Sequence, residues 1–188
     1  MIMLPALALG LSIATQQSQG LHDLKRLNLM SNISQRIRSA ESQGDFVGAL
    51  KILEEERMPL EPGNAGNWLH DARLCYEMGK YELAGTYYDR FIKKEDRGQK
   101  NNWRTSMECF GMLVHSMVDH KSPDWSKLPL YGDMRSAVFV LDIECQSAIA
   151  THYVRTATQV LGEMRKLKAD PGDIQILEAR IQALHPHP

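Results

Sequence analysis

A spacing of 35 residues recurs along the chain, and this spacing restricts the possible fold more than any other feature. Gly44-Asp45-Phe46 is followed 35 residues later by Gly79-Lys80-Tyr81, and Trp68 is followed 35 residues later by Trp103. Periods in this range are typical of proteins in which each repeat is one helical hairpin that packs on its neighbours. The spacing therefore predicts stacked pairs of helices.

The best-defined unit runs from residue 68 to residue 91. Apolar and small residues recur at helical spacing on both sides of Gly79, which predicts two antiparallel helices joined at that glycine. Ala72 and Ala84 are small enough to let the two helices approach closely. Gly79 can adopt the positive φ that often ends a helix. The large residues expected around this contact are Trp68, Tyr76, Tyr81, Tyr88 and Phe91.

This pattern resembles the tetratricopeptide repeat (TPR), whose unit of about 34 residues has an early Trp, a small residue, a Tyr, and later an Ala and an aromatic residue. The chain departs from the pattern at Asp71, where a Leu is usual, and at Cys75, where a Tyr is usual. The closing Pro is also missing. The resemblance implies a scaffold, adaptor or chaperone that works through a curved binding surface.

Weaker units flank this one. Upstream, a helix is expected over residues 32–42 with Ser31 as its N-cap. The turn and second helix that follow would be marked by Gly44, Phe46 and Ala49. Downstream, residues 102–118 are expected to form the first helix of another hairpin, with Trp103 at its start. No matching turn follows, and residues 120–132 are expected to form a long loop.

The last third of the chain is also predicted to be helical. Residues 134–168 form one helix or two, with a break that the sequence does not locate. Asp170 and Pro171 then mark the start of a short amphipathic helix that caps the stack. Period-two alternation is never sustained, so no strand is expected. The predicted fold is an all-α, TPR-like solenoid of two to three hairpins, long C-terminal helices and a capping helix, forming one domain over residues 21–188.

The N-terminal segment, residues 1–20, is treated separately because its first 14 residues carry no charge. They are fewer than the roughly 20 that a membrane-spanning helix needs, and no basic residue precedes them as in a signal peptide. Three interpretations stay open: a retained tail docked on a partner or on a membrane, an export signal, or a helix packed on its own domain. A cytoplasmic or membrane-associated location is favoured, with export left open.

Charge and motifs exclude several classes of function. The chain has 22 basic and 23 acidic residues, so it has no overall field for nucleic acid. No phosphate-binding, hydrolase or zinc-protease motif occurs, and the three cysteines form no CxxC pair. His115 and Asp119 share a helical face, but a third ligand is missing. We therefore expect a non-enzymatic protein with no cofactor and no metal.

The resemblance to TPR proteins also implies which residues meet a partner, because their first helices line the concave surface. The expected partner is another protein, with membrane contact possible through residues 1–14. Arg36 and Arg38 would extend the contact row. The alternatives are a structural subunit of a membrane-associated or virion complex, anchored through the apolar N-terminus, and a TPR-type secretion chaperone. The candidate contact residues are Asn67, His70, Asp71, Arg73, Leu74, Asn102, Thr105, Ser106 and Glu108.

Overall fold

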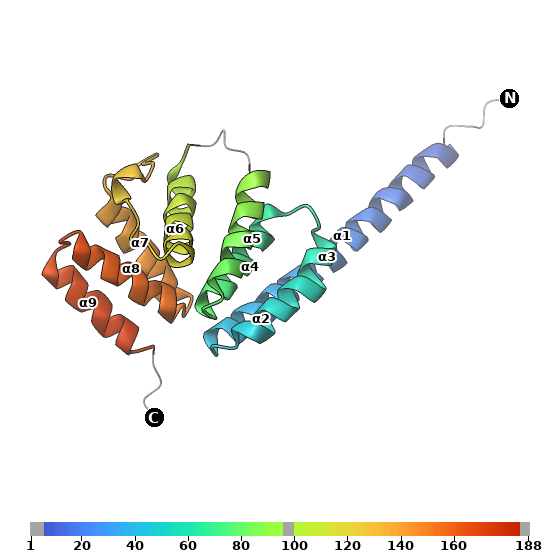
Figure 1. The fold of residues 1–188 in the computed structure, drawn as a ribbon. Helices are drawn as coiled ribbons and strands as arrows, with labels where there is room; N and C mark the ends of the chain where they lie inside the picture. Colours follow the sequence, from blue (N-terminus) through green and yellow to red (C-terminus); the bar gives the residue numbers. More distant parts are fainter. Residues whose placement is uncertain (1–5, 96–99, 185–188) are drawn as a thin grey trace.

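The computed structural model describes residues 6–95 and 100–184, with side chains from residue 23 onward. Helices dominate these residues and no strand occurs among them, which confirms the all-α prediction (Figure 1). The helices are α1 (Ala6–Ser42), α2 (Phe46–Ile52), α3 (Met58–Leu60), α4 (Ala65–Glu77), α5 (Tyr81–Lys94), α6 (Asn102–Val118), α7 (Ala137–Ala150), α8 (Val154–Lys166) and α9 (Pro171–Gln182). A π-helical turn at Leu53–Arg57 joins α2 to α3, and a 3-10 turn lies at Trp125–Lys127.

Most of these helices begin at a side chain that accepts a hydrogen bond from the first turn. Asn64 accepts from Gly66 N at the start of α4, and Ser136 accepts from Phe139 N at the start of α7. Asp170 accepts from Gly172 N (2.7 Å), with Pro171 in the first turn of α9 as expected. Such caps satisfy backbone donors that would otherwise lack a partner.

Left-handed residues end several of the helices. Gly44 and Gly79 both have φ of 75°, the conformation expected from their place in the 35-residue spacing. The break that the sequence does not locate lies between α7 and α8, where His152 has φ of 60°. No glycine marks that turn, so the usual signal for a helix end is absent there.

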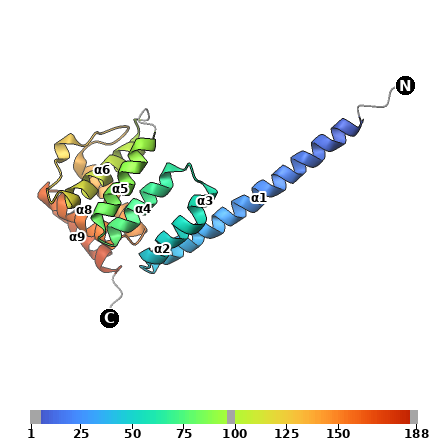
Figure 2. The ribbon, with the colours of Figure 1, turned by 45° about the vertical axis from the view of Figure 1, so that its right-hand side comes forward.

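Helix α1 corrects the expectation of a helix starting at residue 32. It runs from Ala6 to Ser42, so Ser31 lies inside the helix and is not its N-cap. Ser31 followed by Asn32 looks like a start because both residue types cap helices well, but no proline lies between residues 6 and 42 to enforce one. Only the C-terminal part of α1 packs on the fold, through Ile33 and Ile37, and the N-terminal part extends away (Figures 1 and 2).

Helices α4, α5 and α6 enclose one core cluster. Ala72 and Ala84 are fully buried where α4 and α5 meet, as the small residues of the repeat require. Tyr76, Tyr88 and Phe91 fill the space around them. Of the remaining repeat positions, Ala49 is buried and Phe46, Trp68 and Tyr81 are half-buried.

Trp103 does not take the packed position that its spacing from Trp68 suggests. It is 42% exposed and meets Phe91 edge-on, with ring centroids 5.8 Å apart. Its place at the second residue of α6 leaves the indole at the end of the bundle, where the described residues cover it only in part. Position in the repeat therefore does not ensure burial at this site.

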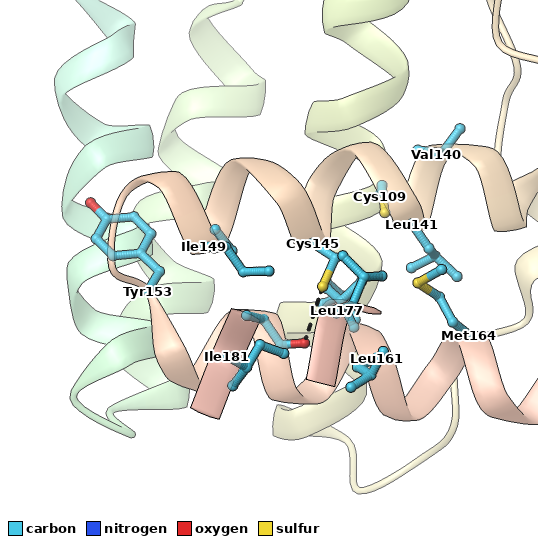
Figure 3. Packing of buried hydrophobic residues seen from close by; sticks show 14 of the residues in the cluster. Cys109, Val140, Leu141, Cys145, Ile149, Tyr153, Leu161, Met164, Leu177 and Ile181 are labelled. Atoms are coloured by element: carbon cyan, nitrogen blue, oxygen red, sulfur yellow. Dashed lines mark hydrogen bonds between the residues drawn. The ribbon is translucent and has the colours of Figure 1, made fainter. Parts of the chain in front are cut away.

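A second core cluster joins the two halves of the chain. It contains Ile33 and Leu53 from the first hairpin, Leu74 from α4, and apolar residues of α7, α8 and α9. Figure 3 shows α7 and α8 side by side, crossing in front of the helices behind them. Cys145 and Leu161 lie in this cluster, and the Cys145 thiol donates to Ala157 O. The C-terminal hairpin is therefore part of the same core as α1, α2, α4 and α6.

Candidate interaction surfaces

The row of contact residues predicted on α4 lies inside the fold. Asn67, Asp71 and Leu74 are at most 2% exposed. His70 and Arg73 are half-buried, and both are engaged by groups of the same chain. The face of α4 that a TPR-like protein would offer to a partner is thus covered.

His70 takes part in a buried hydrogen-bonded group that links three parts of the chain. Its Nε2 lies 2.5 Å from Oε1 of Glu41, near the end of α1, and the Tyr153 hydroxyl donates to the same oxygen. Burial raises the pKa of Glu41, but the hydrogen bonds from His70 and Tyr153 outweigh it and hold that pKa below its ordinary value. This carboxylate joins α1, α4 and the turn before α8.

Arg73 binds α4 to the C-terminal hairpin. Its Nη1 donates to Oε1 of Glu144 on α7 at 2.6 Å, and its guanidinium lies over the Phe110 ring, 4.4 Å from the centroid. Glu144 is 2% exposed, so the pair is shielded from water. Breaking one partner of a buried pair leaves an uncompensated charge, which makes this contact costly to open.

Glu77, at the end of α4, caps α8. Its carboxylate accepts from the backbone N–H groups of Arg155 (2.9 Å) and Thr156 (2.8 Å) and from the Thr156 hydroxyl. Helix α8 has no side-chain cap of its own, so a residue 78 positions away supplies it. Burial raises the pKa of Glu77, although the hydrogen bonds from Thr156 and Arg155 oppose this.

The row predicted on α6 is also largely engaged within the chain. The Asn102 side chain accepts from Asp133 N, and the Thr105 hydroxyl accepts from Tyr131 N, both at 2.9 Å. Glu108 pairs with Arg104 on the same helix. Ser106 is half-buried.

The chain's own residues 130–156 therefore occupy part of the face on which a partner was expected, while Glu41 lies beside His70 and Glu54 and Arg90 lie near Asp71. Contacts from the 130–133 segment, α7 and the start of α8 reach both α4 and α6. The sequence pattern identifies packing positions within each hairpin, but it contains no signal for a later segment that folds back over the first helices. The two arginines that would extend the row lie elsewhere on α1, where Arg36 pairs with Glu56 at 2.6 Å and Arg38 is exposed.

Asp71 is the most unusual of the predicted contact residues. It is fully buried, and neither carboxylate oxygen has a hydrogen-bond partner. Burial and the nearby charge of Glu54 raise its pKa to about 7, with Arg90 opposing the change. A residue expected to meet a partner instead lies between packed helices and is partly neutral at physiological pH.

The exposed apolar residues of α1 were not predicted as a site. Leu24 is 58% exposed and Leu27 is 65% exposed. At about 100° per residue, Leu24 lies about 160° around the helix from the side that Ile33 and Ile37 bury. Leu24 therefore faces away from the domain, and Leu27 lies about 100° around the helix from the buried side. The spacing of three with Leu21 is the signal in the sequence.

A groove of about 630 Å³ lies between α5, α6 and the loop after α6. Ile92 and Met112 line it together with several carboxylates, and it contains His115 and Asp119. His115 Nε2 lies 3.4 Å from Asp89 Oδ1. Among the residues with described side chains, no three His, Cys, Asp or Glu side chains gather closely enough to hold a metal ion.

Comparison of the chain with protein-family models, curated proteins and solved structures finds no match. Within the described part of the chain, no helix is both long enough and apolar enough to cross a membrane.

Proposed function

We propose that the chain is a non-enzymatic, TPR-like scaffold subunit of a multi-protein assembly at a membrane surface, and that helix α1 attaches it there. The observation that carries this proposal is the exposure of Leu24 and Leu27 on α1, on either side of Arg26, which donates to Leu60 O. Leucines that project into water on a free helix are an aggregation liability unless another surface covers them.

The TPR-like character of the scaffold is supported by the hairpin geometry. Gly44 and Gly79 share the same φ, and Ala72 and Ala84 are buried at the close contact between α4 and α5. These features of the hairpins favour a structural role.

A membrane surface is favoured as the covering surface because the first 14 residues carry no charge and are too few to span a bilayer. Leu29 is 48% exposed and, like Leu24 and Leu27, is available for insertion between headgroups and acyl chains. The predicted contact residues on α4 and α6 are largely engaged within the chain, so α1 is the element that remains free for attachment.

The test compares membrane flotation of the full chain, expressed at native level, with that of a Leu24→Asp/Leu27→Asp variant. The wild type should float with membranes, and the variant should lose membrane association about tenfold or more, because two apolar contacts are removed. An Asn28→Asp/Gln35→Asp variant adds the same charge at exposed polar positions of α1 and should float like the wild type.

Two outcomes would contradict the proposal. In the first, the wild type does not float with membranes but binds a stoichiometric protein partner, and the leucine variant loses that partner. The chain would then be a soluble adaptor. If neither membranes nor partners respond to the leucine substitutions, α1 is not the attachment element. Equal circular dichroism and melting would show that all variants fold, since these side chains lie outside the core.

A further inference from the structure

We propose that one end of the helical bundle contacts the headgroups of an anionic membrane. This end carries a half-exposed pair of tryptophans among exposed cations, and we refer to it as the cationic end. The inference rests on the proposed function, because it adds a second contact and a lipid class to the attachment through α1. The cationic end consists of Trp68, Arg90, Lys93, Lys94, Lys100 and Trp103.

The up-and-down order of the helices gathers these residues. Trp68 lies in the first turn of α4, Trp103 lies in the first turn of α6, and Lys93 and Lys94 lie in the last turn of the intervening α5. The Lys94 ammonium lies 5.6 Å from the centroid of the Trp68 ring, and Trp103 meets Phe91 of the same last turn at 5.8 Å. Residues from three helices therefore form one surface.

The charge of this surface is not neutralised by the described residues. Arg90, Lys93, Lys94 and Lys100 are all exposed, and no described carboxylate forms a salt bridge with any of them. Arg90, Lys93 and Lys94 surround a shallow hollow of about 320 Å³ beside Trp68. The acidic neighbours in sequence are Glu95, which is half-buried, and Asp96, which lies outside the described residues.

Tryptophan beside lysine is the pairing that membrane interfaces favour. Indole rings prefer the level of the headgroups, and lysines near an anionic leaflet are attracted to it. An acidic protein would also attract the lysines, but it would not require two half-exposed indoles at the same end. The combination favours lipid as the occupant.

The position of α1 agrees with this assignment. Figures 1 and 2 show its free end extending from the same side of the molecule at which α5 ends and α6 begins. One membrane surface can therefore meet the N-terminal part of α1 and the cationic end together.

The experiment measures binding of the full chain to phosphatidylcholine vesicles with and without phosphatidylserine. The wild type should bind the phosphatidylserine vesicles more tightly, and added salt should weaken that preference. A Lys93→Gln/Lys94→Gln variant should lose about thirtyfold in affinity for phosphatidylserine vesicles and little for neutral ones. A Lys80→Gln/Lys121→Gln variant, which removes two exposed lysines at the start of α5 and after the end of α6, opposite the cationic end, should bind like the wild type.

Tryptophan fluorescence supplies a second measurement. Brominated lipids in the same vesicles should quench the wild type, and Trp103→Phe should lower the quenchable fraction. Trp125 is only 7% exposed and donates to Glu163, so it should contribute little to quenching. Unquenched fluorescence in the bound wild type would overturn the assignment of this end.

The outcomes separate this inference from the proposed function. Vesicle binding that is lost with Leu24→Asp/Leu27→Asp but is unchanged by Lys93→Gln/Lys94→Gln would overturn the inference and leave the proposed function standing. Loss of an acidic protein partner from cells in the lysine variant, with vesicle binding intact, would also overturn it. Absence of any vesicle binding by the wild type would count against both.

Discussion

Asp71 shows how far a single residue can differ from its expected role. A polar residue at a position where TPR units carry Leu reads as a surface contact, yet the carboxylate is buried without a partner. Burial raises its folded pKa to about 7 from an ordinary value of 3.8. The folded state therefore binds this proton more tightly than the unfolded state does. The resulting contribution to the free energy of unfolding is complete below about pH 4 and is lost as pH rises toward 7.

We predict that Asp71→Asn stabilises the protein at pH 8 and changes it little at pH 4. The expected gain at pH 8 is of the order of 4 kcal/mol, from a shift of about three units at 1.36 kcal/mol each. Urea unfolding at the two pH values measures it. Asp133→Asn, at an exposed position, serves as the control, and equal effects of the two substitutions would refute the buried-acid account.

Gly111 is a second position at which a small change in the side chain affects packing, because an added Cβ would meet Tyr88. A Cβ there would lie 2.2 Å from the Tyr88 ring, whose hydroxyl donates to Met107 O. Gly162, also within a helix, has open space at the same point.

We therefore predict that two glycine-to-alanine substitutions change the stability of the protein in opposite directions. Gly111→Ala should destabilise the protein by about 1–3 kcal/mol, because Tyr88 must move. Gly162→Ala should stabilise it by about 0.5–1 kcal/mol through helix propensity. Thermal melting of both variants decides this, and stabilisation by Gly111→Ala would show that α5 and α6 are packed differently.

At the scale of elements, the helices that interact locally were predictable and those that depend on distant residues were not. The α4–α5 hairpin follows from Gly79 and two alanines. The start of α8 could not be predicted, because its cap comes from Glu77 on another helix and its preceding turn uses His152. The length of α1 was missed because Ser31 has the chemistry of a cap without acting as one.

The capping of α8 by Glu77 predicts a local and a global effect. Glu77→Ala should cost about 2–3 kcal/mol, since two backbone donors and a hydroxyl lose their acceptor in a buried place. Hydrogen exchange should accelerate most in the first turn of α8. Glu82→Ala, at an exposed site on α5, should neither lower the stability nor accelerate hydrogen exchange in α8. If exchange at α8 stays slow in the Glu77 variant, the cap is not what holds this helix.

At the scale of the whole molecule, the chain covers its own expected binding face and leaves a different element free. Residues 130–156 reach α4 and α6 through Glu144, Tyr131 and Thr156, while the N-terminal part of α1 extends from the fold. Long-range contacts of this kind do not follow from periodicity, so the packing residues were predictable and the accessible surface was not.

We propose that the chain attaches through α1 and not through the face formed by α4 and α6. Photo-crosslinking in cells distinguishes the two sites, with the reactive side chain placed at Leu24 in one variant and at Ser106 in another. We expect adducts with lipid or with subunits of a membrane assembly from position 24, and none from position 106. Adducts from position 106 with none from position 24 would refute attachment through α1.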